Sequence, residues 1–233
     1  MKSFVLFTLA TFFVVACAAN PGTRPHDMSM GSHDAVAAQA DQPARDHTAQ
    51  SNSSAARTAA SCAGDDGCWT SRVYPTNEHD AAAQRQRELA TEHRAASLAL
   101  REAEAQACGG ISEDDRDMSP FFHREDIQSA RPLNQQAMRA TSAEHVGAVV
   151  VFRAVPGMTA QWLQRVVNCH LARAAAVGNR MPEMDYCPLV LKNVHARVTP
   201  VSDGFEVEIT SEDPATVAEI EKRAEALVLV SVH

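Results

Sequence analysis

Apolar and polar positions alternate most regularly in the last third of the chain. Residues 147–154 (GAVVVFRA) form a continuous apolar run with β-branched side chains, which is typical of a buried strand. Residues 159–178 place apolar side chains at helical spacing between a capping threonine and a terminating glycine. Residues 194–209 alternate on both sides of Asp203-Gly204, which predicts a two-stranded hairpin. An Asp-Pro start predicts a last helix over 213–226.

The order of these elements indicates the fold class. Strand, helix, strand, strand and helix follow one another, and the apolar tail 227–233 either extends the last helix or adds a strand. This order resembles the ferredoxin-like split βαβ two-layer sandwich, in which two helices cover one antiparallel sheet. We therefore expect an α+β domain over residues 146–233. The resemblance implies no activity, because this fold hosts many unrelated functions.

A long helix and a connector are expected over residues 76–145. Asn77 can cap the helix and Gly109-Gly110 can end it. The connector should be a loop, a short helix and another loop, held to the core by Phe121 and Phe122. The stripe of the long helix is mostly alanine and consists of Leu89, His93, Ala96, Leu100, Ala103 and Ala107.

Residues 17–75 show no hydrophobic period. The stretch is rich in Ala, Gln, Ser and Asp, so it buries too little apolar area to offset the entropy of ordering. It is predicted to be a disordered, flexible tether with an r.m.s. reach of roughly 40 Å.

The first residues are typical of an export signal. An apolar run from Phe4 to Val15 is too short to span a bilayer, so residues 1–16 are predicted to be a signal peptide. The run ends in Val14-Val15-Ala16-Cys17, which resembles the lipobox of bacterial lipoproteins. The resemblance implies a lipid on Cys17 and, without Asp at position 18, the periplasmic face of the outer membrane in the cell envelope. The alternative is a plain secretory peptide whose cysteine has no role.

Composition limits both the core and the partners. Hydrophobic residues make up 45% of the chain, but 41 of its 233 residues are alanine, so the core is expected to be small. The net charge of −8 and the lack of a basic block argue against a nucleic-acid partner.

The cysteines are expected to form disulfides in an oxidising compartment. Of the six in the chain, five remain if Cys17 is lipidated, so one thiol is left over. Sequence alone does not fix the pairing. The favoured arrangement joins Cys169 to Cys187 and Cys62 to Cys68, and it leaves Cys108 free at the end of the long helix.

Two sets of residues are candidates for a soft metal ion. Thiolates and imidazoles select Cu(I) or Zn²⁺ over harder ions. The segment PHDMSMGSHD resembles the Met/His segments of bacterial periplasmic copper-handling proteins, although composition bias in a polar linker also produces such clusters. The first set is Cys108, Cys169 and Cys187 with His170 or His123, and the second is His26, Met28, Met30 and His33.

Three functional hypotheses remain, of which a non-enzymatic envelope lipoprotein is favoured. Such a protein would be anchored by its lipid, would bind a protein or cell-wall partner and would need no cofactor. The second hypothesis is a periplasmic lipoprotein that binds copper or zinc. The third, a thiol-dependent enzyme, is disfavoured because neighbours on a helix point about 100° apart, so His170 cannot act as the base for Cys169.

Overall fold

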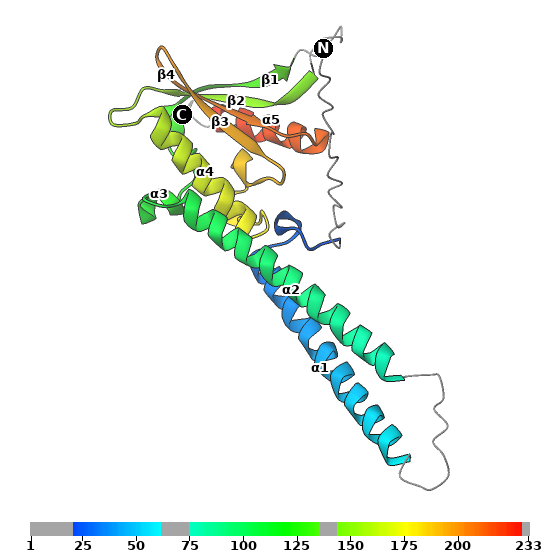
Figure 1. The fold of residues 1–233 in the computed structure, drawn as a ribbon. Coiled ribbons are helices and arrows are strands. Elements are labelled where there is room, and N and C mark those ends of the chain that lie inside the picture. The colour runs from blue at the N-terminus through cyan, green and yellow to red at the C-terminus, as the bar shows by residue number, and fades with distance from the viewer. Residues whose placement is uncertain (1–20, 62–74, 136–143, 230–233) are drawn as a thin grey trace, which may run out of the picture.

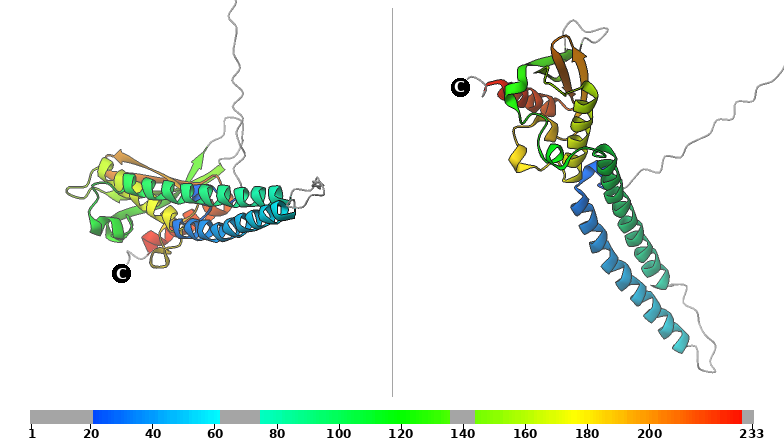
Figure 2. Two further views of the ribbon diagram at one scale, coloured as in Figure 1. Left: turned by 60° about the horizontal axis from the view of Figure 1, so that its bottom comes forward. Right: turned by 90° about the vertical axis from the view of Figure 1, so that its left-hand side faces the viewer.

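The protein consists of a long helical hairpin that projects from an α+β domain (Figures 1 and 2). The computed structural model describes residues 21–61, 75–135 and 144–229. Within these ranges, no helix is both long and apolar enough to cross a membrane. Besides the longer elements below, there are four short 3-10 turns, namely η1 (Pro25–Asp27), η2 (Arg124–Asp126), η3 (Pro182–Met184) and η4 (Pro188–Val190).

The hairpin pairs α1 (Met30–Ser61) with α2 (Pro75–Ala107) in antiparallel orientation. The predicted long helix is confirmed, but it begins at Pro75, so Asn77 lies inside the helix and does not cap it. The prediction of a disordered tether is wrong for residues 30–61, because α1 lies along α2 and shares a seam with it. The seam positions recur every three or four residues, as in a heptad repeat, and are buried or half-buried. They are His33, Ala37, Ala40, Ala44, His47, Ser51 and Ser54 in α1, and His79, Ala83, Gln86, Ala90, His93, Ser97 and Leu100 in α2.

The segment between the hairpin and the domain differs from the expected loop and helix. It contains α3 (Glu113–Asp117) and then a strand, β1 (Ile127–Gln135), which the sequence analysis did not predict. Phe121 is fully buried and its ring packs on that of Phe152, with 5.7 Å between ring centroids. Phe122 is 56% exposed, so only one of the two phenylalanines anchors the segment.

The domain is built on a four-stranded antiparallel sheet in the order β1-β2-β4-β3. The other strands are β2 (Glu144–Arg153), β3 (His195–Val201) and β4 (Gly204–Thr210), and the helices are α4 (Ala160–Ala176) and α5 (Pro214–Leu229). The predicted α+β class is thus confirmed. The predicted caps of both helices are confirmed as well, because the side chains of Thr159 and Asp213 accept hydrogen bonds from the backbone N–H of Trp162 and Thr216.

One face of the sheet forms the core together with the helices. Val150 of β2 and Ile209 of β4 belong to the same buried cluster as Leu163 of α4 and Ile220 of α5. The alternate side chains point to the other face, where Arg131 of β1 forms an ion pair with Glu206 of β4 at 3.0 Å.

The outer edge of β3 is already occupied by a side chain. The amide of Gln164 in α4 donates to the carbonyl oxygen of Ala196 at 3.3 Å and accepts from the N–H of Val198 at 2.7 Å. Pro200, further along β3, has no N–H to offer. An added strand would have to displace Gln164, so this edge is protected against pairing with another chain.

Gly147→Ala is expected to destabilise the fold severely. A Cβ at this position, where φ is 153°, would lie 1.8 Å from the carbonyl oxygen of Ile209 on the adjacent strand. The strands would have to separate, so we expect the free energy of unfolding in a urea titration to fall by about 3 kcal/mol or more.

Gly157→Ala is the matched control for that substitution. Its φ is also positive, at 86°, but nothing lies within 4 Å of the added Cβ. It should cost only about 1 to 2 kcal/mol, the penalty for a left-handed residue other than glycine. Equal losses in the two variants would contradict the close approach of β2 and β4 at Gly147.

Candidate functional site

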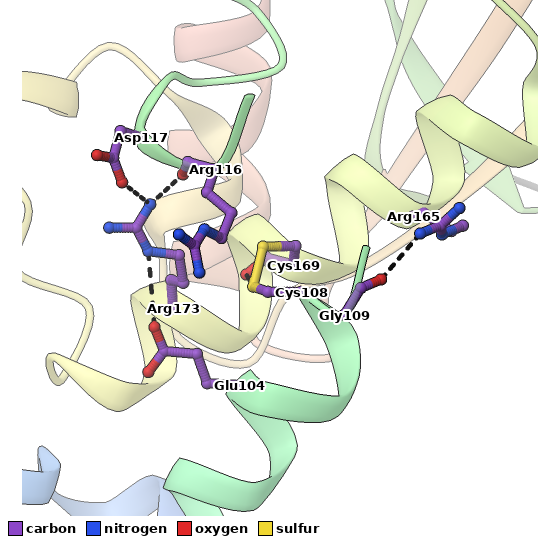
Figure 3. The surroundings of a disulfide bond; sticks show 8 residues. All are labelled: Glu104, Cys108, Gly109, Arg116, Asp117, Arg165, Cys169 and Arg173. Atoms are coloured by element: carbon purple, nitrogen blue, oxygen red, sulfur yellow. Dashed lines mark hydrogen bonds and ion pairs between the residues drawn. A yellow bond between two sulfur atoms is a disulfide. The ribbon is translucent and has the colours of Figure 1, made fainter. Parts of the chain in front are cut away.

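A disulfide joins the hairpin to the domain. Cys108 directly follows the last residue of α2 and is bonded to Cys169 in α4, with 4.6 Å between their Cα atoms and a sequence separation of 61 (Figure 3). Both residues are buried. This bond replaces the predicted Cys169–Cys187 bridge. Cys169 faces α2. His170, the next residue of α4, points in a different direction because successive helical side chains diverge, and Cys187 lies beside it.

Two arginines of α4 reinforce this connection (Figure 3). Arg173 forms ion pairs with Asp117 at 2.7 Å and with Glu104 at 3.7 Å, and it also donates to the carbonyl oxygen of Arg116. Arg165 donates to the carbonyl oxygen of Gly109 at 2.8 Å. The end of α2 and the residues that follow it are therefore held to α4 by one covalent bond and several charged contacts.

A groove of about 1150 Å³ lies next to this junction, between α2 and α4. Its apolar lining includes Leu100 and Ala103 of α2, Leu171 and Ala175 of α4, and Leu191 from the segment before β3. The groove is of the size of a site for a small ligand or a peptide segment.

Polar side chains also line the groove. They include those of Asn168, Lys192, Asn193, His26 and His195. Among the described residues that line the groove there is no Phe, Tyr or Trp. Apolar groups next to amides and charges suit the side chains and backbone of a peptide.

Cys187 contacts the imidazole of His170, the residue that the sequence analysis considered and rejected as the base for Cys169. Sγ of Cys187 lies 3.4 Å from Nε2 of His170, and the two residues are 0% and 2% exposed. Burial raises the pKa of the Cys187 thiol to about 11, and burial, with Arg173 nearby, lowers the pKa of His170 to about 4. Among the described residues, Nδ1 of His170 has no hydrogen-bond partner.

The chemistry of this pair follows from the two pKa values. A reactive thiolate beside an imidazolium requires a thiol whose pKa is lower than that of the imidazole. Here the order is reversed, so a neutral thiol contacts a neutral imidazole at physiological pH. Both groups are also closed off from substrate, which makes the pair part of the core rather than a nucleophile and its base.

The predicted thiol cluster for a metal ion does not form. Cys108 and Cys169 have no thiolate to offer because they share the disulfide, and Cys187 contacts only His170 of the proposed histidines. His123 is exposed and pairs with Glu125 at 3.0 Å. Within the described ranges, no three His, Cys, Asp or Glu side chains form a group that could hold a metal ion.

The Met/His segment lies at the base of the hairpin. His33 is buried against His93, His26 is exposed and lines the groove, and Met28 and Met30 are half-buried. Of the four, only His33 makes a ring-nitrogen contact with another histidine. Cys17, Cys62 and Cys68, which carried the predicted lipid and the second bridge, lie outside the described residues.

Two histidine pairs cross the hairpin, and the sequence analysis missed both. The Nδ1 atoms of His33 and His93 are 2.9 Å apart, and those of His47 and His79 are 3.3 Å apart. On each helix the two histidines are fourteen residues apart, which is two heptads. That shared spacing was the available signal, but it has meaning only once α1 is known to be a helix.

Comparisons with known proteins give no relative for this chain: no family model, curated protein or solved structure matches it.

The double variant Cys108→Ser, Cys169→Ser should be less stable by about 4 kcal/mol, the chain-entropy value for a closed loop of this length. Urea unfolding measures the loss. Reductant should destabilise the natural protein by a similar amount and leave the double variant unchanged. An effect of reductant that persists in the double variant would place the stabilising bridge elsewhere.

His170 should make the fold sensitive to acid. Its pKa in the folded protein, about 4, is below the ordinary value of 6.5, so the unfolded chain binds the proton more readily. The free energy of unfolding is therefore unaffected by this group above pH 6.5. As the pH falls from 6.5 to 4, protonation of His170 in the unfolded chain lowers the free energy of unfolding by about 3 kcal/mol.

His170→Gln is the variant that isolates this contribution. The pKa of His93 is also lowered, mainly by burial, so part of the acid sensitivity should remain. We expect a plot of the free energy of unfolding against pH to be flatter for His170→Gln between pH 6.5 and 4. Parallel curves for the two proteins would mean that His170 is not buried in its neutral form.

Proposed function

We propose that this protein is a lipid-anchored, non-enzymatic component of the bacterial cell envelope that binds a protein partner in the groove at its hairpin–domain junction. The observation that carries the proposal is the Cys108–Cys169 bond beside that groove. Disulfides persist in oxidising compartments such as the periplasm, which agrees with the export signal and lipobox expected from the sequence. The bond also fixes the relative position of α2 and α4, which both line the groove.

The fold supports a binding role but does not specify an activity. We further propose that the domain is a ferredoxin-like sandwich in which β1, upstream of the first predicted strand, takes the edge position beside β2. The sheet order β1-β2-β4-β3 and the single core shared by the sheet and helices support this arrangement. Because Gln164 covers the edge of β3, a partner would bind through the groove rather than by adding a strand there.

The proposed anchor is close in sequence to a residue that lines the groove. Only residues 18–20 separate Cys17 from Pro21, where the described structure begins, so the two Cα atoms are at most about 14 Å apart. His26, a few residues further on, lines the groove. A lipid on Cys17 would therefore hold the groove near the membrane surface, in place of the long tether expected from the sequence. The partner would then be a protein at or near that membrane.

A photo-reactive residue at Ala103 tests the proposal in cells that export the full-length protein. Ala103 is exposed and lines the groove, so it should cross-link to a partner. Ala105 is the matched control, because it is also exposed on α2 but does not line the groove. Adducts are expected from position 103 and not from position 105. Equal labelling, or none, would contradict a partner in the groove, and an adduct with cell-wall material would assign the groove to a glycan.

Cys17→Ser tests the anchor in the same cells. The protein should lose acyl labelling and move from the membrane fraction to the soluble periplasmic fraction, because its only proposed lipid attachment is gone. The Ala103 adduct should weaken at the same time, since the groove is no longer held at the membrane. Retention of Cys17→Ser protein in the membrane fraction would contradict the anchor.

A further inference from the structure

The half-buried histidine pair of the hairpin has the geometry of a metal-binding site. His47 lies on α1 and His79 on α2, and both are half-buried. Their ring planes are inclined by 31°, with 5.6 Å between ring centroids. The Nδ1 atoms are 3.3 Å apart, so the same nitrogen of each ring is directed at the other ring.

This separation equals the spacing of two imidazole ligands on one ion. Zinc–nitrogen bonds of 2.0–2.1 Å at the tetrahedral angle place two ligand nitrogens about 3.3 Å apart. An ion could therefore be bound by Nδ1 of His47 and Nδ1 of His79 without separating the two helices.

The buried pair at the base of the hairpin differs in ways that argue against an ion there. Nε2 of His33 donates to the carbonyl oxygen of Pro25 at 3.3 Å, which leaves its Nδ1 as an acceptor for Nδ1–H of His93 at 2.9 Å. The two side chains are 0% and 3% exposed, so no water could complete the coordination of an ion. This pair is an interhelical hydrogen bond.

At His47 and His79, by contrast, solvent can supply the remaining ligands. Open coordination positions filled by water are usual when a protein offers fewer than four ligands. The exposed carboxylates of Asp46, Glu78 and Asp80 adjoin the pair in sequence and add negative charge around it. Arg87, which donates to Thr48 at 2.5 Å, and Arg45, two residues before His47, are cations that oppose this attraction.

We propose that His47 and His79 bind a divalent transition-metal ion, with Zn²⁺ as the best fit, through Nδ1 of each ring and with water as the other ligands. Imidazole nitrogens suit zinc, nickel and copper rather than the harder magnesium or calcium ions. The ring that carries a proton on Nδ1 shifts it to Nε2 on binding, so that both Nδ1 atoms can bind the ion. The ion would cross-link a seam that buries little apolar area.

Zinc binding to the purified full-length protein in detergent tests this assignment. Calorimetric titration with ZnCl₂ should give one saturable site per chain. The melting temperature, followed by helical circular dichroism, should rise by about 5 °C when free Zn²⁺ is about 100 times the dissociation constant. His47→Gln and His79→Gln should each weaken binding at least about tenfold and abolish the shift, since each removes one of two protein ligands.

His123→Gln is the matched control, because His123 is an exposed histidine 44 residues after His79 in sequence. This variant should bind zinc as the natural protein does. Unchanged dichroism without metal verifies that the glutamine variants remain folded. If zinc fails to bind, or binds equally to His47→Gln, the proposal is wrong. Loss of binding in Cys62→Ser, Cys68→Ser instead would assign the ion to those cysteines and would also overturn it.

Discussion

The covalent bond between Cys108 and Cys169 is the constraint on which the rest of the structure depends. It fixes the end of α2 against α4, and through α4 to the sheet. The ion pairs of Arg173 lie on the same contact, but charged contacts that solvent reaches contribute little by themselves. Without the bond, the hairpin would keep only a narrow attachment to the domain. The bond therefore also holds the groove in a defined shape, because α2 and α4 both line it.

The two helices of the hairpin pack closely against each other mostly through small side chains, with few large apolar residues between them. Its seam is mostly alanine, and small side chains let the helices lie close together but bury little area per residue. Polar contacts across the seam therefore determine its register. The His33–His93 hydrogen bond is shielded from water, and the pairs Arg94–Asp41 and Arg101–Asp34 flank it at the surface. A seam of this kind sets the register of the two helices but stabilises their pairing only weakly. An ion bound by His47 and His79 would therefore add stability to the distal half of the hairpin.

The sequence predicted the elements of the domain in which large apolar residues repeat at one period, and also helix α2, whose alanine stripe includes Leu89 and Leu100. Strands β2 and β4 and helices α4 and α5 have such patterns and clear caps, and each was predicted. Helix α1 was missed because its stripe is alanine, histidine and serine, and because Pro43 in its middle disfavours a helix locally. Strand β1 was missed because it is an edge strand with a proline and mostly exposed side chains. In both cases the deciding contacts are with distant segments.

The same limit applies to the candidate site. Sequence identified the cysteines of the junction but paired them wrongly, because pairing depends on which side of α4 faces α2. It singled out neither His47 nor His79, because their pairing depends on α1 being a helix. Mass mapping of the natural protein, digested without reduction, tests the central claim most directly. The structure predicts a peptide pair joined through Cys108 and Cys169, with Cys187 recovered as a free thiol. A pair joined through Cys169 and Cys187 would contradict it.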